Sequence, residues 1–173
     1  MVLPRAERRI DKMIMKLDAL YGKFLKIANL LQSPVLLLIR LDWGYQFWES
    51  GWAHFNNMPD FISMFERLHI PAPSLNAHFI AGLEAGGGIL LALGLGSRII
   101  SLLLAGDMFV AFITAERESL QSIFSDPDKF FNASPHTFLF IALLILAFGP
   151  GKISLDHLIV TLRKKPIQAA ATS

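Results

Sequence analysis

The sequence predicts an all-α protein, in which a bundle of four transmembrane helices follows an amphipathic helix at the membrane interface. Of the 173 residues, 53% are hydrophobic and only 17% are charged, whereas soluble domains carry about 25% charged residues. The mean hydropathy is +0.47. The apolar residues also gather into runs about as long as a helix that crosses a bilayer, so lipid is the expected solvent.

Residues 8–31 carry apolar side chains three and four positions apart, which is the spacing of one helix face. The opposite face carries lysines. Such a helix fits the membrane interface, with its basic face toward anionic head groups of the cytoplasmic leaflet. A helix packed on a protein partner is the alternative. We favour a membrane surface over nucleic acid for this basic segment, because a hydrophobic protein follows it directly.

Four apolar segments come next and are expected to span the bilayer. The first opens with Ser33 as N-cap and Pro34 at the first helical position. The four expected spans are residues 33–54, 74–94, 98–115 and 135–149. The connections at 55–75 and 116–135 are expected outside, the first with a short amphipathic turn and the second as an acidic loop. The chain is thereby divided into a basic arm (1–32), a four-helix membrane domain (33–151) and a basic tail (152–173).

Basic residues concentrate at the two ends of the chain. Of sixteen Lys and Arg, seven precede residue 30 and four follow Gly151, whereas the connection 116–135 carries four acids. Because cytoplasmic segments of membrane proteins are enriched in Lys and Arg, both termini are expected in the cytoplasm.

Four ionisable residues fall inside the expected spans: Arg40, Asp42, Glu84 and Asp107. Such groups are costly in a membrane and are candidates for function. Helical rise places them at comparable depths, which predicts one buried cluster in the inner half of the bundle, with Arg40 bonded to Glu84, Asp107 or both. The cluster could fix helix register as an ion pair. It could instead exchange a proton or bind the polar head of a quinone or lipid.

The first span also carries Asp42, Gln46 and Glu49 on one helical stripe. A span this polar must lie inside the bundle, line a cavity or face a partner subunit. Near the outer ends of the spans lie four weak candidates for metal ligands: Glu49, His54, His78 and His136. They form no local ligand motif, so we predict no metal site from them.

Five motifs follow one another between residues 35 and 160. They are Arg40-Leu41 with Gly44, Phe47 and Gly51; Leu68–Pro73; Glu84 with Gly87-Gly88; Leu93–Arg98; and Gly149–Asp156. In this order they resemble the DoxX family of small four-helix membrane proteins. The resemblance implies a multi-pass protein of the bacterial inner membrane, associated with redox systems such as a thiosulfate–quinone oxidoreductase. Only Arg40, Glu84 and the Gly149–Asp156 ending carry over residue by residue. A lysine often present in the family is His54 here.

The resemblance favours a subunit of a quinone-linked redox system that uses the buried cluster. Two alternatives remain open: a non-catalytic module that binds or moves a small hydrophobic molecule or lipid, and a membrane anchor for a partner protein. The expected partners are the lipid bilayer, a redox subunit and, as an open question, a second copy of the chain. Whether the chain is an enzyme, and whether a quinone is its ligand, are not decided by the sequence.

Overall fold

The computed structural model describes the backbone of residues 5–170 and the side chains of residues 14–163. Every secondary-structure element within these residues is an α-helix. They are α1 (Arg5–Asn56), α2 (Met58–Arg67), α3 (Pro73–Leu93), α4 (Ser97–Thr114), α5 (Arg117–Gln121), α6 (Pro127–Phe131), α7 (Ser134–Phe148) and α8 (Leu155–Ala170). The predicted all-α class is confirmed. Part of the predicted basic arm and tail lies outside the described side chains.

Three of these helices are long and apolar enough to cross a membrane: the stretch Ile14–Asn56 of α1, and the whole of α3 and α4. The helix α7 is apolar but has 15 residues, which is about 22 Å at 1.5 Å per residue. The predicted ends of the second, third and fourth apolar segments all fall within one residue of α3, α4 and α7.

The helix α1 has no start at Ser33. It runs unbroken from Arg5 to Asn56 with Pro34 in its interior, so the predicted N-cap was wrong. The Ser33 Oγ accepts a hydrogen bond from the backbone N–H of Lys152 at 3.1 Å and thus holds the chain that follows α7. Pro34 removes one internal hydrogen bond, but the apolar periodicity continues on both sides and the helix persists.

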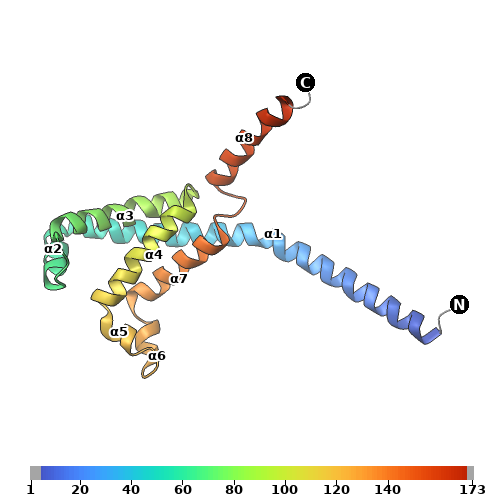
Figure 1. Cartoon of the computed structure of the whole chain (residues 1–173), viewed down its shortest axis with the longest axis horizontal. Helices are drawn as coiled ribbons and strands as arrows, with labels where there is room; N and C mark the ends of the chain where they lie inside the picture. Colours follow the sequence, from blue (N-terminus) through green and yellow to red (C-terminus); the bar gives the residue numbers. More distant parts are fainter. Residues whose placement is uncertain (1–4, 171–173) are drawn as a thin grey trace.

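The bundle consists of two closely packed helix pairs, α1 with α3 and α4 with α7 (Figure 1). Glycines let α1 and α3 approach. A Cβ on Gly88 would lie 2.5 Å from the carbonyl oxygen of Gly44, and a Cβ on Gly51 would overlap the backbone at Ala85. Such contacts between small residues are typical of helix packing in lipid. The core shared by the pairs contains Phe47, Leu91, Leu104, Met108, Ile141 and Ile145.

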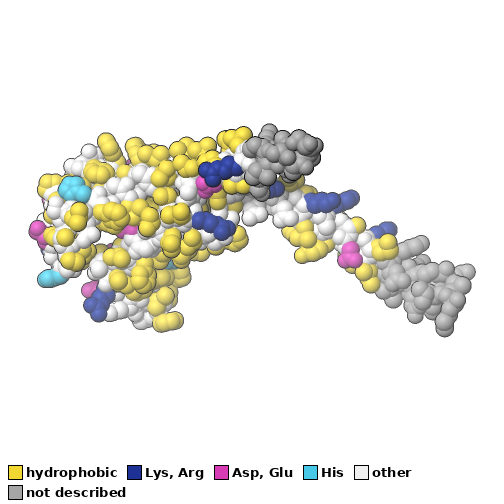
Figure 2. All heavy atoms as spheres, turned by 45° about the horizontal axis from the view of Figure 1, so that its top comes forward, with side chains coloured by type: hydrophobic (Ala, Val, Ile, Leu, Met, Phe, Trp, Pro, Cys, Tyr) yellow, Lys and Arg dark blue, Asp and Glu magenta, His cyan; other side chains and the backbone are white. Residues whose placement is uncertain are grey.

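The two pairs join at the short turn between α3 and α4 and diverge toward the opposite end (Figure 1). There the helix α2 folds back on α3 through Phe61, Phe65, Ala77 and Ala81. The predicted loop 116–135 contains two short helices, α5 and α6. Apolar side chains cover much of the bundle face seen in Figure 2, as expected for helices that face lipid. The N-terminal part of α1 and the helix α8 project away from the bundle at its other end (Figure 1).

Candidate functional site

Arg40 does not join the other predicted residues. It is fully buried, its Nη2 donates to the carbonyl oxygen of Ile153, and the nearby Asp156 attracts its charge. Its guanidinium lies against Gly94, where any Cβ would overlap it. Nε and Nη1 make no hydrogen bond. The predicted pairing with Glu84 or Asp107 was therefore wrong. The depth of Arg40 was counted from Pro34, but the inner end of the bundle lies at the last turn of α3.

Asp156, which follows α7 in the chain, lies near Arg40 and binds the turn between α3 and α4. Its carboxylate oxygens accept hydrogen bonds from the backbone N–H groups of Gly96 (2.8 Å) and Ser97 (3.1 Å), at the N-terminus of α4. Its own N–H donates to the Gly94 carbonyl oxygen at 3.0 Å. A carboxylate at a helix N-terminus satisfies free N–H groups and complements the helix dipole. We call Arg40, Gly94, Gly96, Ile153 and Asp156 the inner junction.

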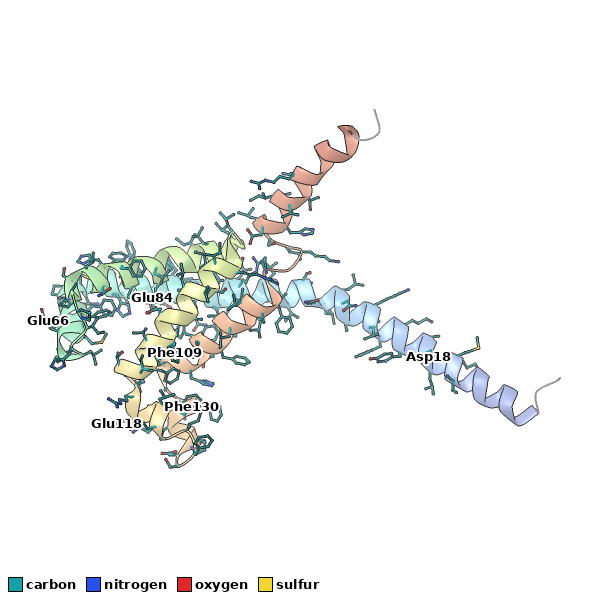
Figure 3. The ribbon with its side chains drawn as sticks, viewed as in Figure 1. Asp18, Glu66, Glu84, Phe109, Glu118 and Phe130 are labelled. Carbon is teal, nitrogen blue, oxygen red and sulfur yellow. The ribbon has the colours of Figure 1, made fainter. Side chains whose placement is uncertain are left out.

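Glu84 lies elsewhere, at a cavity of about 500 Å³ between α1, α2, α3, α4 and α7. This cavity, the outer cavity, opens where the two helix pairs diverge. Figure 3 shows Glu84 inside the bundle, whereas Glu66 and Glu118 lie on the outer connections. Most lining side chains are apolar, among them Phe61, Phe65, Phe79, Ile80, Leu83, Leu103, Met108, Val110 and Phe138. The polar lining side chains are Ser50, His54, Asn76, Glu84, Asp107, Thr114 and Ser134.

Glu84 is held from α1. It is 4% exposed, and its Oε2 accepts a hydrogen bond from Ser50 Oγ at 3.1 Å. His54 Nε2 lies 3.3 Å from the same oxygen. The ring of Phe61 from α2 stacks on the imidazole with ring centroids 3.7 Å apart. Two partners from α1 and one aromatic ring from α2 therefore fix the orientation of this carboxylate.

Asp107 of α4 lines the same cavity, close enough for its charge to act on Glu84. Its Oδ2 is buried and has no hydrogen-bond partner. Each acid is nine or ten residues from the inner end of its helix, which is about 15 Å at 1.5 Å per residue. The structure thus places Glu84 and Asp107 on one cavity near the middle of α3 and α4, whereas we predicted them with Arg40 in the inner half of the bundle.

Asp42 lies outside both sites. Its side chain is exposed on α1 and accepts a hydrogen bond from Gln46 Nε2 at 3.2 Å. We predicted that all four charged residues are buried inside the bundle. For Asp42 this prediction was wrong, because the bundle covers other faces of α1.

The four weak metal candidates do not converge. Among the described residues, no group of three or more His, Cys, Asp or Glu could hold a metal ion. His54 contacts Glu84, His78 lies 2.7 Å from the carbonyl oxygen of Ser74, and His136 packs on Phe130 and Phe131. Glu49 is exposed.

Sequence reasoning missed Ser50 and Phe61. Ser50 precedes His54 by four residues, so both lie on one helix face, and that spacing was a usable signal. The stacking of Phe61 on His54 depends on the fold of α2, for which the sequence gives no comparable sign.

Comparison with known proteins covers the first part of the bundle. Residues 35–117 match the DoxX family, a range that includes Arg40, Ser50, His54, Glu84 and Asp107 and ends before Asp156. The Bacillus subtilis (strain 168) protein named "Putative oxidoreductase CatD" is 35% identical over 80 residues, which are 46% of this chain and 58% of that protein. The chain thus matches little more than half the length of that relative. No solved structure matches the chain.

Proposed function

We propose, from the match of residues 35–117 to the DoxX family, that the chain is a membrane-embedded subunit of a redox system and holds a quinone in the outer cavity. The proposal is supported by two carboxylates, Glu84 and Asp107, that line one cavity with apolar walls near the middle of α3 and α4. The redox role is supported by the name of the Bacillus relative.

The outer cavity fits the two parts of a quinone. Its volume of about 500 Å³ lies within the range of small-molecule sites. The walls contributed by Phe79, Leu103 and Val110 suit an apolar ring and tail. The same three side chains are more exposed than the core, so the cavity is bordered by surface that would face lipid. A ligand dissolved in the bilayer could therefore reach it without crossing water.

The polar groups of the cavity are suited to the oxygens of such a ring. A bound quinone supplies two-electron, two-proton redox chemistry. In this proposal Glu84 and Asp107 hold and exchange protons at the ring oxygens, while Ser50 and His54 orient Glu84. The electrons come from a redox partner protein. The chain has no cysteine, and thiolates are the usual ligands of iron–sulfur clusters.

The proposal includes a topology. α1, α3, α4 and α7 cross the inner membrane, with both termini in the cytoplasm and the inner junction at the cytoplasmic side. The N-terminal part of α1 lies at the interface, supported by its exposed apolar side chains, among them Leu17, Leu20 and Phe24. Because the chain lacks cysteine, single cysteines at Lys152 and at Glu118 allow a clean test. A membrane-impermeant thiol reagent applied to intact cells should label Glu118→Cys and spare Lys152→Cys; the reverse pattern would contradict the topology.

The binding site is tested by filling it. A Cβ on Gly106, which lines the cavity, meets nothing within 4 Å, so Gly106→Leu can enter the cavity without displacing backbone. Gly86 is equally open but lies outside the lining, which makes Gly86→Leu the matched control. The affinity of nanodisc-embedded protein for a short-chain benzoquinone is measured. We expect at least a tenfold loss in Gly106→Leu and none in Gly86→Leu. Equal affinities in both variants would contradict the proposed site.

A further inference from the structure

One face of α1 is polar where it should meet lipid. α1 packs on α3 through Gly44 and Gly51, and Phe47 enters the core. The remaining face carries side chains three or four positions apart that are exposed or half-buried: Asp42, Tyr45, Gln46, Glu49 and Trp52. We call this set the polar face of α1. None of its members lines the outer cavity.

This face extends from the last turn of α3, level with Asp42, to the middle of α3, level with Glu49. Gly44 contacts Gly88 and Ala92, and Gly51 contacts Ala81 and Ala85, so Glu49 is level with the middle of the membrane-spanning helix α3. An acidic side chain at the centre of a bilayer costs about 2.5–3.5 kcal/mol on insertion scales. A carboxylate that stayed against hydrocarbon would therefore weaken the membrane-embedded state.

Within residues 14–163, whose side chains the structure describes, no cation pairs with these acids. Among the described side chains, the ion pairs join His54 to Glu84 and Lys129 to Glu118. Of the side chains that the structure describes, the Gln46 amide donates a hydrogen bond to Asp42. The polar face lies on the outside of the bundle, where a second protein can provide the missing donors.

We propose that the polar face docks a transmembrane helix of a partner protein that carries two basic side chains. Asp42 and Glu49 are seven residues apart, which is about 10 Å along α1. Lys or Arg residues seven positions apart on the partner would match that spacing. A second copy of this chain fits less well, because it would bring four carboxylates together, and like charges in an interface are unfavourable.

The test uses a synthetic partner. A leucine-rich single-span peptide carries two lysines seven residues apart, and a second peptide carries leucine at both positions. The full chain is labelled at Lys152→Cys, an exposed position outside the polar face, and energy transfer to each labelled peptide is measured in phosphatidylcholine vesicles. We expect the lysine peptide to associate at least tenfold more tightly than the leucine peptide. Asp42→Asn combined with Glu49→Gln should remove this difference, whereas Glu118→Gln should preserve it.

Two outcomes would overturn the proposal. One is that both peptides associate equally with the unsubstituted chain, while circular dichroism shows that this chain is folded and helical. The other is energy transfer between two labelled copies of the chain that the double variant abolishes, since a second copy would then occupy the face. Because Asp42 and Glu49 do not line the outer cavity, quinone affinity in the double variant should be unchanged, and either failure leaves the cavity proposal standing.

Discussion

The inner junction and the outer cavity both place charged groups within the bundle, but they use them differently. At the inner junction, backbone and side chains from three distant segments close tightly around Arg40, and a Cβ on Gly94 would find no space. Both regions hold buried polar atoms without a hydrogen-bond partner, but those of Arg40 lie in close packing, whereas the Oδ2 of Asp107 lies beside open volume. The first arrangement fastens chain segments together, and the second leaves polar groups available to a ligand.

The same contrast explains the motifs that resemble the family. Residues Leu93–Arg98 and Gly149–Asp156 meet Arg40 in space and form one structural junction. Glu84 belongs to the other region. A motif that contains a charged residue in a membrane is therefore no guide to chemistry until its partners are known.

The largest expected effect is on stability at the inner junction. Arg40→Ala removes a fully buried side chain that donates to the Ile153 carbonyl oxygen, and truncating a large buried side chain to alanine costs about 2–5 kcal/mol. Arg98→Ala is the control, because Arg98 is exposed and makes one long contact, 3.4 Å to the carbonyl oxygen of Ala147. In mixed micelles, the free energy of unfolding should be clearly lower for Arg40→Ala than for Arg98→Ala. Equal stabilities would mean that the junction does not fasten the fold.

A smaller effect is expected where α1 meets α3. Gly88→Leu places a Cβ within 2.5 Å of the Gly44 carbonyl oxygen, and overpacking of this kind costs about 1–3 kcal/mol. Gly86→Leu, two residues earlier on the same helix, meets no atom within 4 Å and should change stability by less than about 0.5 kcal/mol. The test is to measure the free energy of unfolding of both variants in mixed micelles. If Gly86→Leu proved as harmful as Gly88→Leu, the close helix contact would not explain the loss.

Asp107→Asn should sharpen the contrast by leaving stability almost unchanged. The Oδ2 of Asp107 makes no hydrogen bond, so the substitution breaks none there, and removing a charge near Glu84 relieves repulsion. We expect a change in the free energy of unfolding below about 1 kcal/mol together with weaker quinone binding. Strong destabilisation without loss of affinity would assign Asp107 to the fold instead.

The smallest effect belongs to the surface. Lys129 and Glu118 form an ion pair at 3.0 Å in the outer connection, with the Glu118 side chain 88% exposed. Exposed pairs contribute about 0–1 kcal/mol, so Lys129→Ala should have little effect on unfolding or quinone affinity. A loss as large as that in Arg40→Ala would show that the outer connection is part of the stable core.

The ends of α3 and α7 and the start of α4 follow from the sequence because proline and glycine mark them beside long apolar runs, and the end of α4 follows from the charged residues that begin at Glu116. The start of α1 could not be obtained this way. Ser33 and Pro34 form a good local cap signal, but Ser33 instead receives the N–H of Lys152 from a distant segment.

The candidate site was predictable only in part. Helical rise brought Glu84 and Asp107 to one depth, and both line one cavity. Counting depth from Pro34 placed Arg40 too far into the bundle. Its hydrogen-bond partner Ile153 lies more than a hundred residues away, and nothing local in the sequence indicates that contact. The exposure of Asp42 depends on which α1 face α3 covers, which is likewise decided by packing.

The central claim is that Glu84 serves a ligand whereas Arg40 serves the fold. The most direct measurement is the affinity of nanodisc-embedded Glu84→Gln for a short-chain benzoquinone, taken together with its unfolding midpoint. Glutamine retains the size of the side chain, so the account predicts a stable protein with at least tenfold weaker binding. Unchanged affinity in a folded Glu84→Gln variant would contradict it.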